Sequence, residues 1–121
     1  MAPEESDMED LMLMDDPDFD RVMECVFGIR KHESRVYFTL IEFPGSTVSE
    51  LADDLDRDRS NINRSLGTLH EKQLIERQRR LLEGGGYVYQ YFAHPLPVIK
   101  ERLHHGVDEW CEQVHETIEN L

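Results

Sequence analysis

The stretch over residues 47–73 constrains the fold more than any other part of this sequence, because it has the pattern of two short amphipathic helices in tandem. Thr47 and Glu50 have the spacing of a capping box, in which each side chain hydrogen-bonds the other residue's backbone N–H. Apolar residues at helical spacing predict helices over residues 48–55 and 59–73, separated by three polar residues. The expected buried stripes are Val48, Leu51, Ala52 and Leu55 in the first helix, and Ile62, Leu66 and Leu69 in the second. Two such helices joined by a tight turn form a helix-turn-helix pattern.

The apolar period changes directly after the second helix. Residues 74–82 mix polar and apolar side chains, and residues 87–92 are rich in aromatic and β-branched ones. Three consecutive glycines, at residues 84–86, lie between the two segments. Glycine adopts positive φ without steric cost, so the pattern predicts a β-hairpin with a glycine-rich tip. A hairpin that follows a helix-turn-helix in this way is the layout of a winged helix.

Two more helices are predicted before this unit, over residues 18–29 and 33–43. Asp18 stands at the N-cap position of the first, Gly28 lies near its end, and a Pro-Gly pair ends the second. A long helix is predicted from residue 96 to the end of the chain, with apolar residues recurring every three or four positions. This spacing is close to that of a coiled-coil seam, so we expect the helix to pair with a second copy of the chain. The expected dimer-interface residues are Leu96, Ile99, Leu103, Val107, Trp110, Val114, Ile118 and Leu121.

The expected fold class is therefore mainly α with a small β-hairpin (α+β), a winged helix-turn-helix with a long C-terminal dimerisation helix. We expect three segments. Residues 1–16 form an acidic, flexible tail, residues 17–94 the winged helix-turn-helix domain that binds DNA, and residues 95–121 the dimerisation helix.

The charge of the chain is very unevenly distributed. Its 121 residues include 26 acidic and 13 basic ones, for a formal net charge of −13. Residues 1–20 hold nine acids and no base, whereas residues 57–80 hold seven bases and three acids. The net charge alone argues against a nucleic-acid partner, but residues 57–80, which we call the basic island, fall on the helix-turn-helix and the hairpin. A solvated helix face is the alternative interpretation of such an island.

Residues near the start of the helix over 59–73 are of types that read DNA. Arginine donates two hydrogen bonds to guanine, asparagine suits adenine, and serine with the free N–H groups of a first helical turn suits phosphate. We also expect Asp58 to cap this helix with its side chain. The candidate residues of the recognition helix are Arg59, Ser60, Asn61, Asn63, Arg64 and Thr68. Those of the wing are Arg77, Arg79, Arg80, Gly84, Gly85 and Tyr87. The alternative is a winged helix that serves as a protein–protein interaction module without specific DNA binding.

Histidines and cysteines near the C-terminus are candidates for a metal site. They are His104, His105, Cys111 and His115. Cys111 and His115 have the i, i+4 spacing that suits a metal ligand pair, but no CxxC motif accompanies them, so a structural role is favoured. Cys25 lies among apolar residues, and Cys111 lies beside acidic ones that disfavour a thiolate, so neither is expected to be a reactive thiol. We expect no metal and no cofactor.

The sequence contains no P-loop, no nucleophile elbow and no HExxH motif, so an enzyme is not expected. No apolar run approaches the roughly 20 residues of a membrane span, and the N-terminus lacks the basic region of a secretory signal. Two cysteines do not make a disulfide framework. A cytoplasmic protein without a membrane partner is expected.

Family resemblance is carried by residues 46–80, STVSELADDLDRDRSNINRSLGTLHEKQLIERQRR, and by residues 83–95, EGGGYVYQYFAHP. They resemble the winged helix-turn-helix of archaeal TrmB-like and MarR-like transcriptional regulators. The acidic composition resembles haloarchaeal members, among them the RosR-type regulators linked to oxidative stress. The resemblance implies a sequence-specific regulator that acts as a homodimer, with the helix over 59–73 in the major groove and a wing over 77–87 on the backbone or in the minor groove.

The implied setting is a high-salt cytoplasm, and the implied partners are double-stranded promoter DNA, a second copy of the chain, and salt cations on the acidic surface. At molar salt the Debye length falls to about 3 Å, so only direct contacts matter. We therefore expect DNA binding that tolerates molar KCl, with cations bridging acidic side chains and phosphates.

Overall fold

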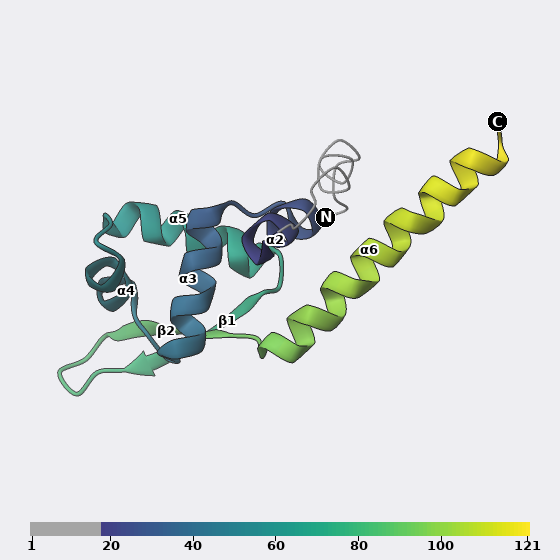
Figure 1. The fold of residues 1–121 in the computed structure, drawn as a ribbon. Helices are drawn as coiled ribbons and strands as arrows, with labels where there is room; N and C mark the ends of the chain where they lie inside the picture. The colour runs from purple at the N-terminus through teal and green to yellow at the C-terminus, as the bar shows by residue number, and fades with distance from the viewer. Residues whose placement is uncertain (1–17) are drawn as a thin grey trace. The chain divides into compact units, whose positions relative to one another are not determined.

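The computed structural model describes residues 18–121, so the predicted acidic tail over residues 1–16 lies outside the described residues. The described part contains five helices and one pair of strands, which confirms a mainly helical fold with a single hairpin (Figure 1). The elements are α2 (Phe19–Phe27), α3 (Lys31–Glu42), α4 (Val48–Leu55), α5 (Arg59–Glu71), β1 (Ile75–Leu81), β2 (Tyr87–Ala93) and α6 (Leu96–Glu119). They fall into two compact units, one made of residues 32–96 and the other of residues 18–31 with 97–121.

The unit over residues 32–96 contains the helix-turn-helix. Thr47 forms the predicted capping box at the start of α4: its Oγ1 accepts from the N–H of Glu50 at 3.2 Å, and the Glu50 carboxylate accepts from the N–H of Thr47 at 3.0 Å. Asp56 ends α4 in the left-handed conformation, with φ of 51°. Its N–H bonds back to the last turn of the helix, which turns the chain towards α5.

The start of α5 differs from the prediction in one respect. Asp58 occupies the N-cap position, but its side chain makes no capping hydrogen bond, so the predicted side-chain cap is wrong. The regular helical hydrogen bonds begin at Ile62, whose N–H donates to the carbonyl oxygen of Asp58 at 3.1 Å. Asp58 is exposed, so water can solvate its carboxylate without a backbone partner. The N–H groups of the first turn of α5 are therefore left open to solvent.

The core of this unit is built from the apolar faces that the sequence indicated. Its fully or almost fully buried side chains are Val36, Tyr37, Leu40, Leu51, Ile62, Leu66, Leu69, Leu74 and Ile75. Burial of one such side chain contributes about 1.5–3 kcal/mol. The hydroxyl of Tyr37 also donates to the carbonyl oxygen of His94 at 2.7 Å, which ties α3 to the end of β2. The predicted stripe of α5 is thus confirmed, and its opposite face is left to solvent.

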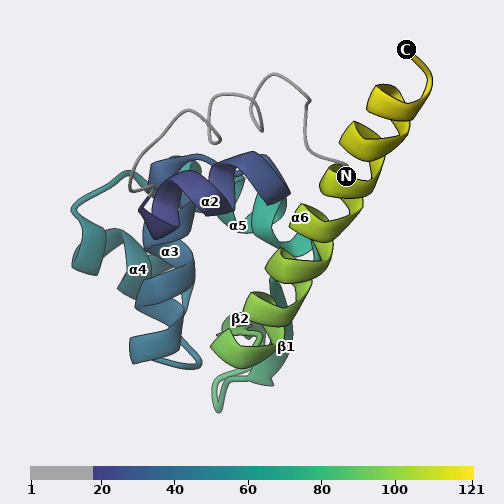
Figure 2. The same ribbon diagram turned by 45° about the vertical axis from the view of Figure 1, so that its right-hand side comes forward.

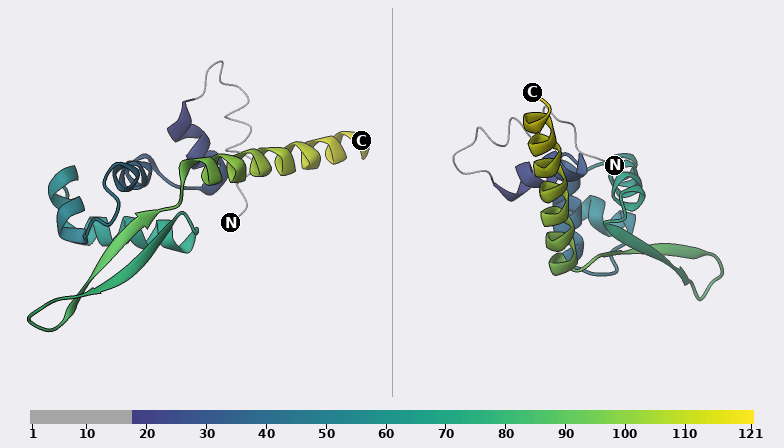
Figure 3. Two further views of the ribbon diagram at one scale, coloured as in Figure 1. Left: turned by 90° about the horizontal axis from the view of Figure 1, so that it is seen from below. Right: turned by 90° about the vertical axis from the view of Figure 1, so that its right-hand side faces the viewer.

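The predicted hairpin is present, with β1 and β2 antiparallel and paired from Ile75↔Ala93 to Leu81↔Tyr87 (Figure 3). Gly85 and Gly86 at the tip have φ of 93° and 77°, which are values that other residues rarely adopt. At its base the hairpin is joined to the α3–α4 connection. The N–H of Tyr91 donates to the carbonyl oxygen of Ser46 at 3.0 Å, and the carbonyl oxygen of Tyr91 accepts from the N–H of Gly45 at 2.8 Å.

The second unit contains α2 and α6. Asp18 caps α2 as predicted, since its Oδ1 accepts from the N–H of Arg21 at 2.8 Å, and Gly28 ends the helix in the left-handed conformation. Cys25 is fully buried, in agreement with a role in packing. Helix α6 continues without interruption through Gly106 (Figure 2). A Cβ atom at Gly106 would lie 2.6 Å from Cγ1 of Val26, so glycine is needed there for the close approach of the two helices.

The apolar stripe of α6 is used unevenly within one chain. Ile99, Leu103 and Trp110 are already buried, whereas Ile118 is 55% exposed and Leu121 is fully exposed. The remaining predicted interface positions, Leu96, Val107 and Val114, are half-buried. It is therefore the C-terminal part of the stripe that offers apolar surface to another molecule. None of the helices in residues 18–121 combines the length and the apolar character needed to cross a bilayer.

The tight approach at Gly106 generates a stability prediction. Alanine in place of an exposed helical glycine stabilises a helix by about 1 kcal/mol. At Gly106 the added methyl group overlaps Val26, a branched side chain that cannot swing away, so we expect Gly106→Ala to destabilise the protein by about 1–3 kcal/mol. Urea denaturation followed by circular dichroism measures the difference.

Gly67→Ala is the matched control, because a Cβ at Gly67 on α5 meets no atom within 4 Å. This variant should stabilise the protein by about 1 kcal/mol. Equal stabilisation by both substitutions would show that α2 does not approach α6 at Gly106.

Candidate nucleic-acid interface

The predicted recognition residues of α5 lie on its solvent side. Arg59, Ser60, Asn61, Asn63 and Arg64 are all exposed, because Ile62 and the rest of the buried stripe occupy the opposite side. Thr68 differs from them, since it is half-buried and its hydroxyl donates to the carbonyl oxygen of Arg64 at 3.2 Å. The first two turns of α5 thus carry the accessible polar groups.

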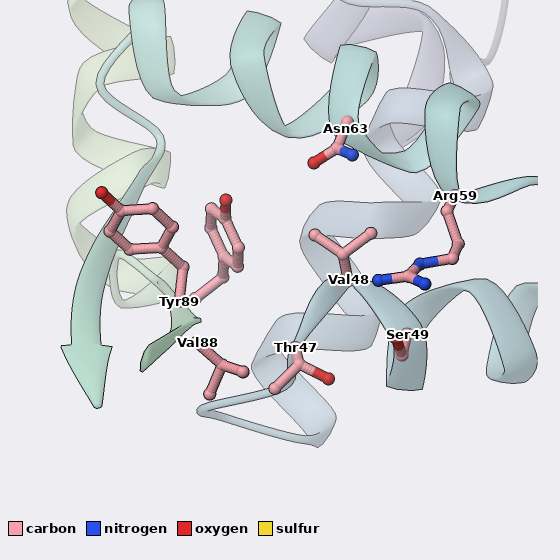
Figure 4. Close-up of a pocket in the computed structure, with 8 residues that line it drawn as sticks. Thr47, Val48, Ser49, Arg59, Asn63, Val88 and Tyr89 are labelled. Carbon is pink, nitrogen blue, oxygen red and sulfur yellow. The ribbon is translucent and has the colours of Figure 1, made fainter. Parts of the chain in front are cut away.

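A hollow of about 300 Å³ lies between the start of α5, the start of α4 and strand β2 (Figure 4). In Figure 4 the side chains of Arg59 and Asn63 extend from α5 towards this space, and Tyr89 reaches it from the hairpin. The residues that line it are Thr47, Val48, Ser49, Arg59, Asn63, Val88, Tyr89 and Tyr91. The structure therefore brings two predicted α5 residues together with the hairpin and with the N-terminal turn of α4.

Four of the lining residues are polar or aromatic positions that sequence reasoning missed: Thr47, Ser49, Tyr89 and Tyr91. The sequence indicates Thr47 only as a helix cap, and its hydroxyl is used there in the structure. Tyr89 could have been found from the strand period, since it lies two residues from Tyr87 and therefore on the same face of the hairpin. The position of Ser49 depends on how α4 meets the hairpin, and the sequence carries no local signal for it.

The wing arginines are separated by the alternation of the strand. Arg77 and Arg79 share a face of β1 with tyrosine side chains of β2. The guanidinium carbon of Arg77 lies 4.4 Å from the centre of the Tyr89 ring, and that of Arg79 lies 4.8 Å from the centre of the Tyr87 ring. Arg80 pairs with Val88 and projects from the opposite face. The three predicted wing arginines thus do not form one cluster.

The five arginines of α5 and the hairpin have no acidic partner in the described part of the chain. Among residues 18–121, no ion pair joins a carboxylate to any of Arg59, Arg64, Arg77, Arg79 and Arg80. All five are exposed. Their positive charge is therefore available to an anion from outside the chain.

The hairpin tip is open to a ligand. Gly84 and Gly85 are exposed, and a Cβ atom added at either position would meet nothing within 4 Å. The backbone of another molecule can therefore approach the tip closely.

The histidines and cysteines of α6 do not come together as ligands. Within the described part of the chain, no group of three or more His, Cys, Asp or Glu residues could hold a metal ion. His105 pairs with Glu109 one turn away, with 3.0 Å between Nε2 and Oε1, and Cys111 is half-buried. The anion-accessible surface around α5 and the hairpin is thus the candidate site.

Two helices joined by a short turn, an exposed and basic second helix, and a hairpin packed behind it define a winged helix-turn-helix protein. Residues 23–96 match the family model described as sugar-specific transcriptional regulator TrmB. The chain belongs to this family of transcriptional regulators.

One relative and one solved structure resemble most of this chain. An uncharacterized protein of Methanocaldococcus jannaschii is 33% identical over 103 residues, which cover 85% of this chain and 78% of that protein. The structure of a possible transcriptional regulator from Methanosarcina mazei has a TM-score of 0.75 and 27% identity, covering 82% of this chain and 84% of that one.

More distant structures share the fold alone. A MarR family transcription regulator has a TM-score of 0.54 at 20% identity, covering 84% of this chain and 64% of that one. A variant of S. aureus MepR bound to an oligodeoxyribonucleotide has a TM-score of 0.53 at 16% identity, covering 84% of this chain and 72% of that one. The expected winged-helix fold is confirmed, and so is the resemblance to TrmB-like and MarR-like regulators.

Proposed function

We propose that this chain is a sequence-specific DNA-binding transcriptional regulator that acts as a homodimer. The observation that carries the proposal is the exposed and basic surface of α5 and of one face of the hairpin. Arg59, Arg64, Arg77 and Arg79 have no acidic partner within residues 18–121, in a chain whose net charge is −13. Membership of a transcriptional regulator family supports it, and so does a fold shared with a protein whose structure is bound to an oligodeoxyribonucleotide.

The parts of the surface take different roles in this proposal. Asn63, Arg59 and Arg64 on the first two turns of α5 read base edges in the major groove. Ser60 and Asn61, with the open N–H groups at the start of α5, bind phosphates. The hairpin contacts the backbone or the minor groove of the same DNA. Two such units in a dimer would address half-sites about one helical turn apart.

The base-reading residues give the first functional prediction. Asn63→Ala and Arg64→Ala should each weaken binding by about 1–3 kcal/mol, because each removes a base contact without touching the core. The DNA is an operator selected by the natural protein from random duplexes, and fluorescence anisotropy measures the affinity.

Arg35→Ala controls for charge in this experiment, because Arg35 is an exposed arginine on α3, outside the basic island. It should leave the affinity almost unchanged. An Arg64→Ala variant that binds the selected operator as tightly as the natural protein would remove α5 from the proposed interface.

Dimerisation is tested at the exposed end of α6. Ile118→Glu places a charge in the proposed apolar seam and should convert the dimer into a monomer, as measured by light scattering during gel filtration at micromolar concentration. Ile118 suits this test better than Trp110, since a charge at buried Trp110 would also unfold the chain. Thr117→Glu adds the same charge one residue away, outside the stripe, and should stay dimeric. A natural protein that is monomeric at this concentration would contradict the coiled-coil interpretation.

The acidic composition supports a setting of high salt, and we propose a haloarchaeal cytoplasm and a role in the response to oxidative stress, as in RosR-type regulators. Binding should then survive in molar KCl, because cations held between carboxylates and phosphates offset the counterions that DNA releases. Affinity measured over KCl concentrations from dilute to molar tests this. A loss of several powers of ten, as for a basic DNA-binding protein, would refute it.

A second candidate function is a protein–protein interaction module. Two exposed leucines next to the hairpin tip, Leu81 and Leu82, favour it. Chromatin immunoprecipitation distinguishes the two functions, since a regulator gives discrete promoter peaks and an interaction module gives background alone.

A further inference from the structure

Four side chains on one face of the hairpin form a stacked row. Arg77 lies over the ring of Tyr89, and Arg79 lies over the ring of Tyr87. The two tyrosine rings contact each other edge to face, with 5.4 Å between their centres and 74° between their planes. Each arginine therefore stacks on the tyrosine diagonal to it across the two strands rather than on its direct neighbour. We call these four residues the arginine–tyrosine row.

The row begins at the site described above. Tyr89 lines the hollow together with Arg59 and Asn63, so the row continues the α5 surface along the hairpin towards its tip. Val88 lines the same hollow from the other face, so the two faces differ in the arginine–tyrosine contacts and not in their distance from α5. Arg80, on the same strand, serves as the comparison for Arg77 and Arg79. It has the same charge and is also exposed, but it projects from the other face, next to Val88. The hairpin thus has one face on which arginines are stacked and one on which the arginine is not.

Contact with an aromatic ring changes the entropy that an arginine side chain loses when it binds an anion. A free surface arginine loses much of its rotamer freedom when it binds, and this loss weakens the contact. A guanidinium held over an aromatic ring has already lost part of that freedom. Its N–H donors lie in the plane of the group and stay free for a phosphate oxygen. An aromatic partner, unlike a carboxylate, orders the arginine without neutralising it.

We propose that Tyr87 and Tyr89 are positioning residues that hold the guanidinium groups of Arg79 and Arg77 for contact with DNA phosphates, and that Arg80 takes no part in this contact. The inference rests on the proposed DNA-binding function. It divides the wing residues into an active face and an inactive face, and it assigns a role to Tyr89, which acts on the DNA through Arg77.

The test uses the full chain and its selected operator, with affinity measured over a range of KCl concentrations. Loss of one phosphate contact changes the slope of log K against log[salt] by about 0.9. Arg77→Ala and Arg79→Ala should each change the slope by about this amount for every wing in the complex, and Arg80→Ala should leave it unchanged. Equal effects of Arg77→Ala and Arg80→Ala would overturn the assignment of faces.

The positioning role is tested by a pair of substitutions at Tyr89. Tyr89→Leu removes the ring and should weaken binding about two- to tenfold per wing, the range expected when one more flexible side chain must be ordered on binding. Tyr89→Phe keeps the ring and should bind as the natural protein does. The same leucine substitution in an Arg77→Ala background should have no further effect, because the group that the ring positions is then absent.

The same set of single and double substitutions can be made independently at Tyr87 and Arg79. Its side chain is half exposed, so Tyr87→Leu is tolerated by the fold even if Tyr89→Leu is not, and circular dichroism reports the fold of each variant. If Tyr87→Leu weakens DNA binding equally with Arg79 present and in an Arg79→Ala background, the tyrosine has a structural role and the proposal is refuted. Failure of the natural protein to select any operator would instead refute the proposed function. Normal binding with a sensitive Arg64 and insensitive tyrosines would refute only the positioning role.

Discussion

The pairing of β2 on both of its edges is the constraint on which the proposed interface depends. One edge of β2 pairs with β1 over seven residues, and on the other edge Tyr91 exchanges two backbone hydrogen bonds with Gly45 and Ser46. The side-chain amide of Gln90 adds a third bond, to the carbonyl oxygen of Gly45 at 3.1 Å. Because residues 45–46 lead directly into α4, these bonds fix the register of the hairpin relative to the helix-turn-helix. The hollow with Arg59 on one side and Tyr89 on the other follows from that register.

Most of the fold could be read from the sequence because its signals are local. The capping box at Thr47, the helical spacing of Ile62, Leu66 and Leu69, and the glycines of the hairpin tip each act within a few residues. The sequence-based expectations fail where a residue contacts another residue that is distant in the chain. From the sequence alone, Gly106 is expected to destabilise its helix, but in the structure its missing side chain makes room for Val26. Trp110 is expected at a dimer interface, but it is already buried within one chain.

The candidate site was only half predictable for a related reason. Residue type and helical spacing indicate which side chains of α5 face solvent, and this does not require a partner element. The grouping of Arg77, Arg79 and Arg80 rests on their proximity in sequence, and the strand alternation separates them. The uncapped start of α5 is informative in the same way. The sequence predicts that Asp58 uses its carboxylate on the helix, and the N–H groups that it leaves open are donors that suit a phosphate.

Charge and its placement explain how a chain of net charge −13 can present a cationic surface. In so acidic a chain, an arginine near a carboxylate would form an ion pair with it, and its charge would then be less available to an external anion. The hairpin avoids this by placing tyrosines, rather than acids, opposite Arg77 and Arg79. Aromatic rings attract a guanidinium through their quadrupole, over short range and in contact. An attraction of this kind is less sensitive to salt than an ion pair between exposed charges, which is screened beyond a Debye length of about 3 Å at 1 M. Stacked arginines would therefore stay ordered and charged at the high salt concentration proposed for this chain.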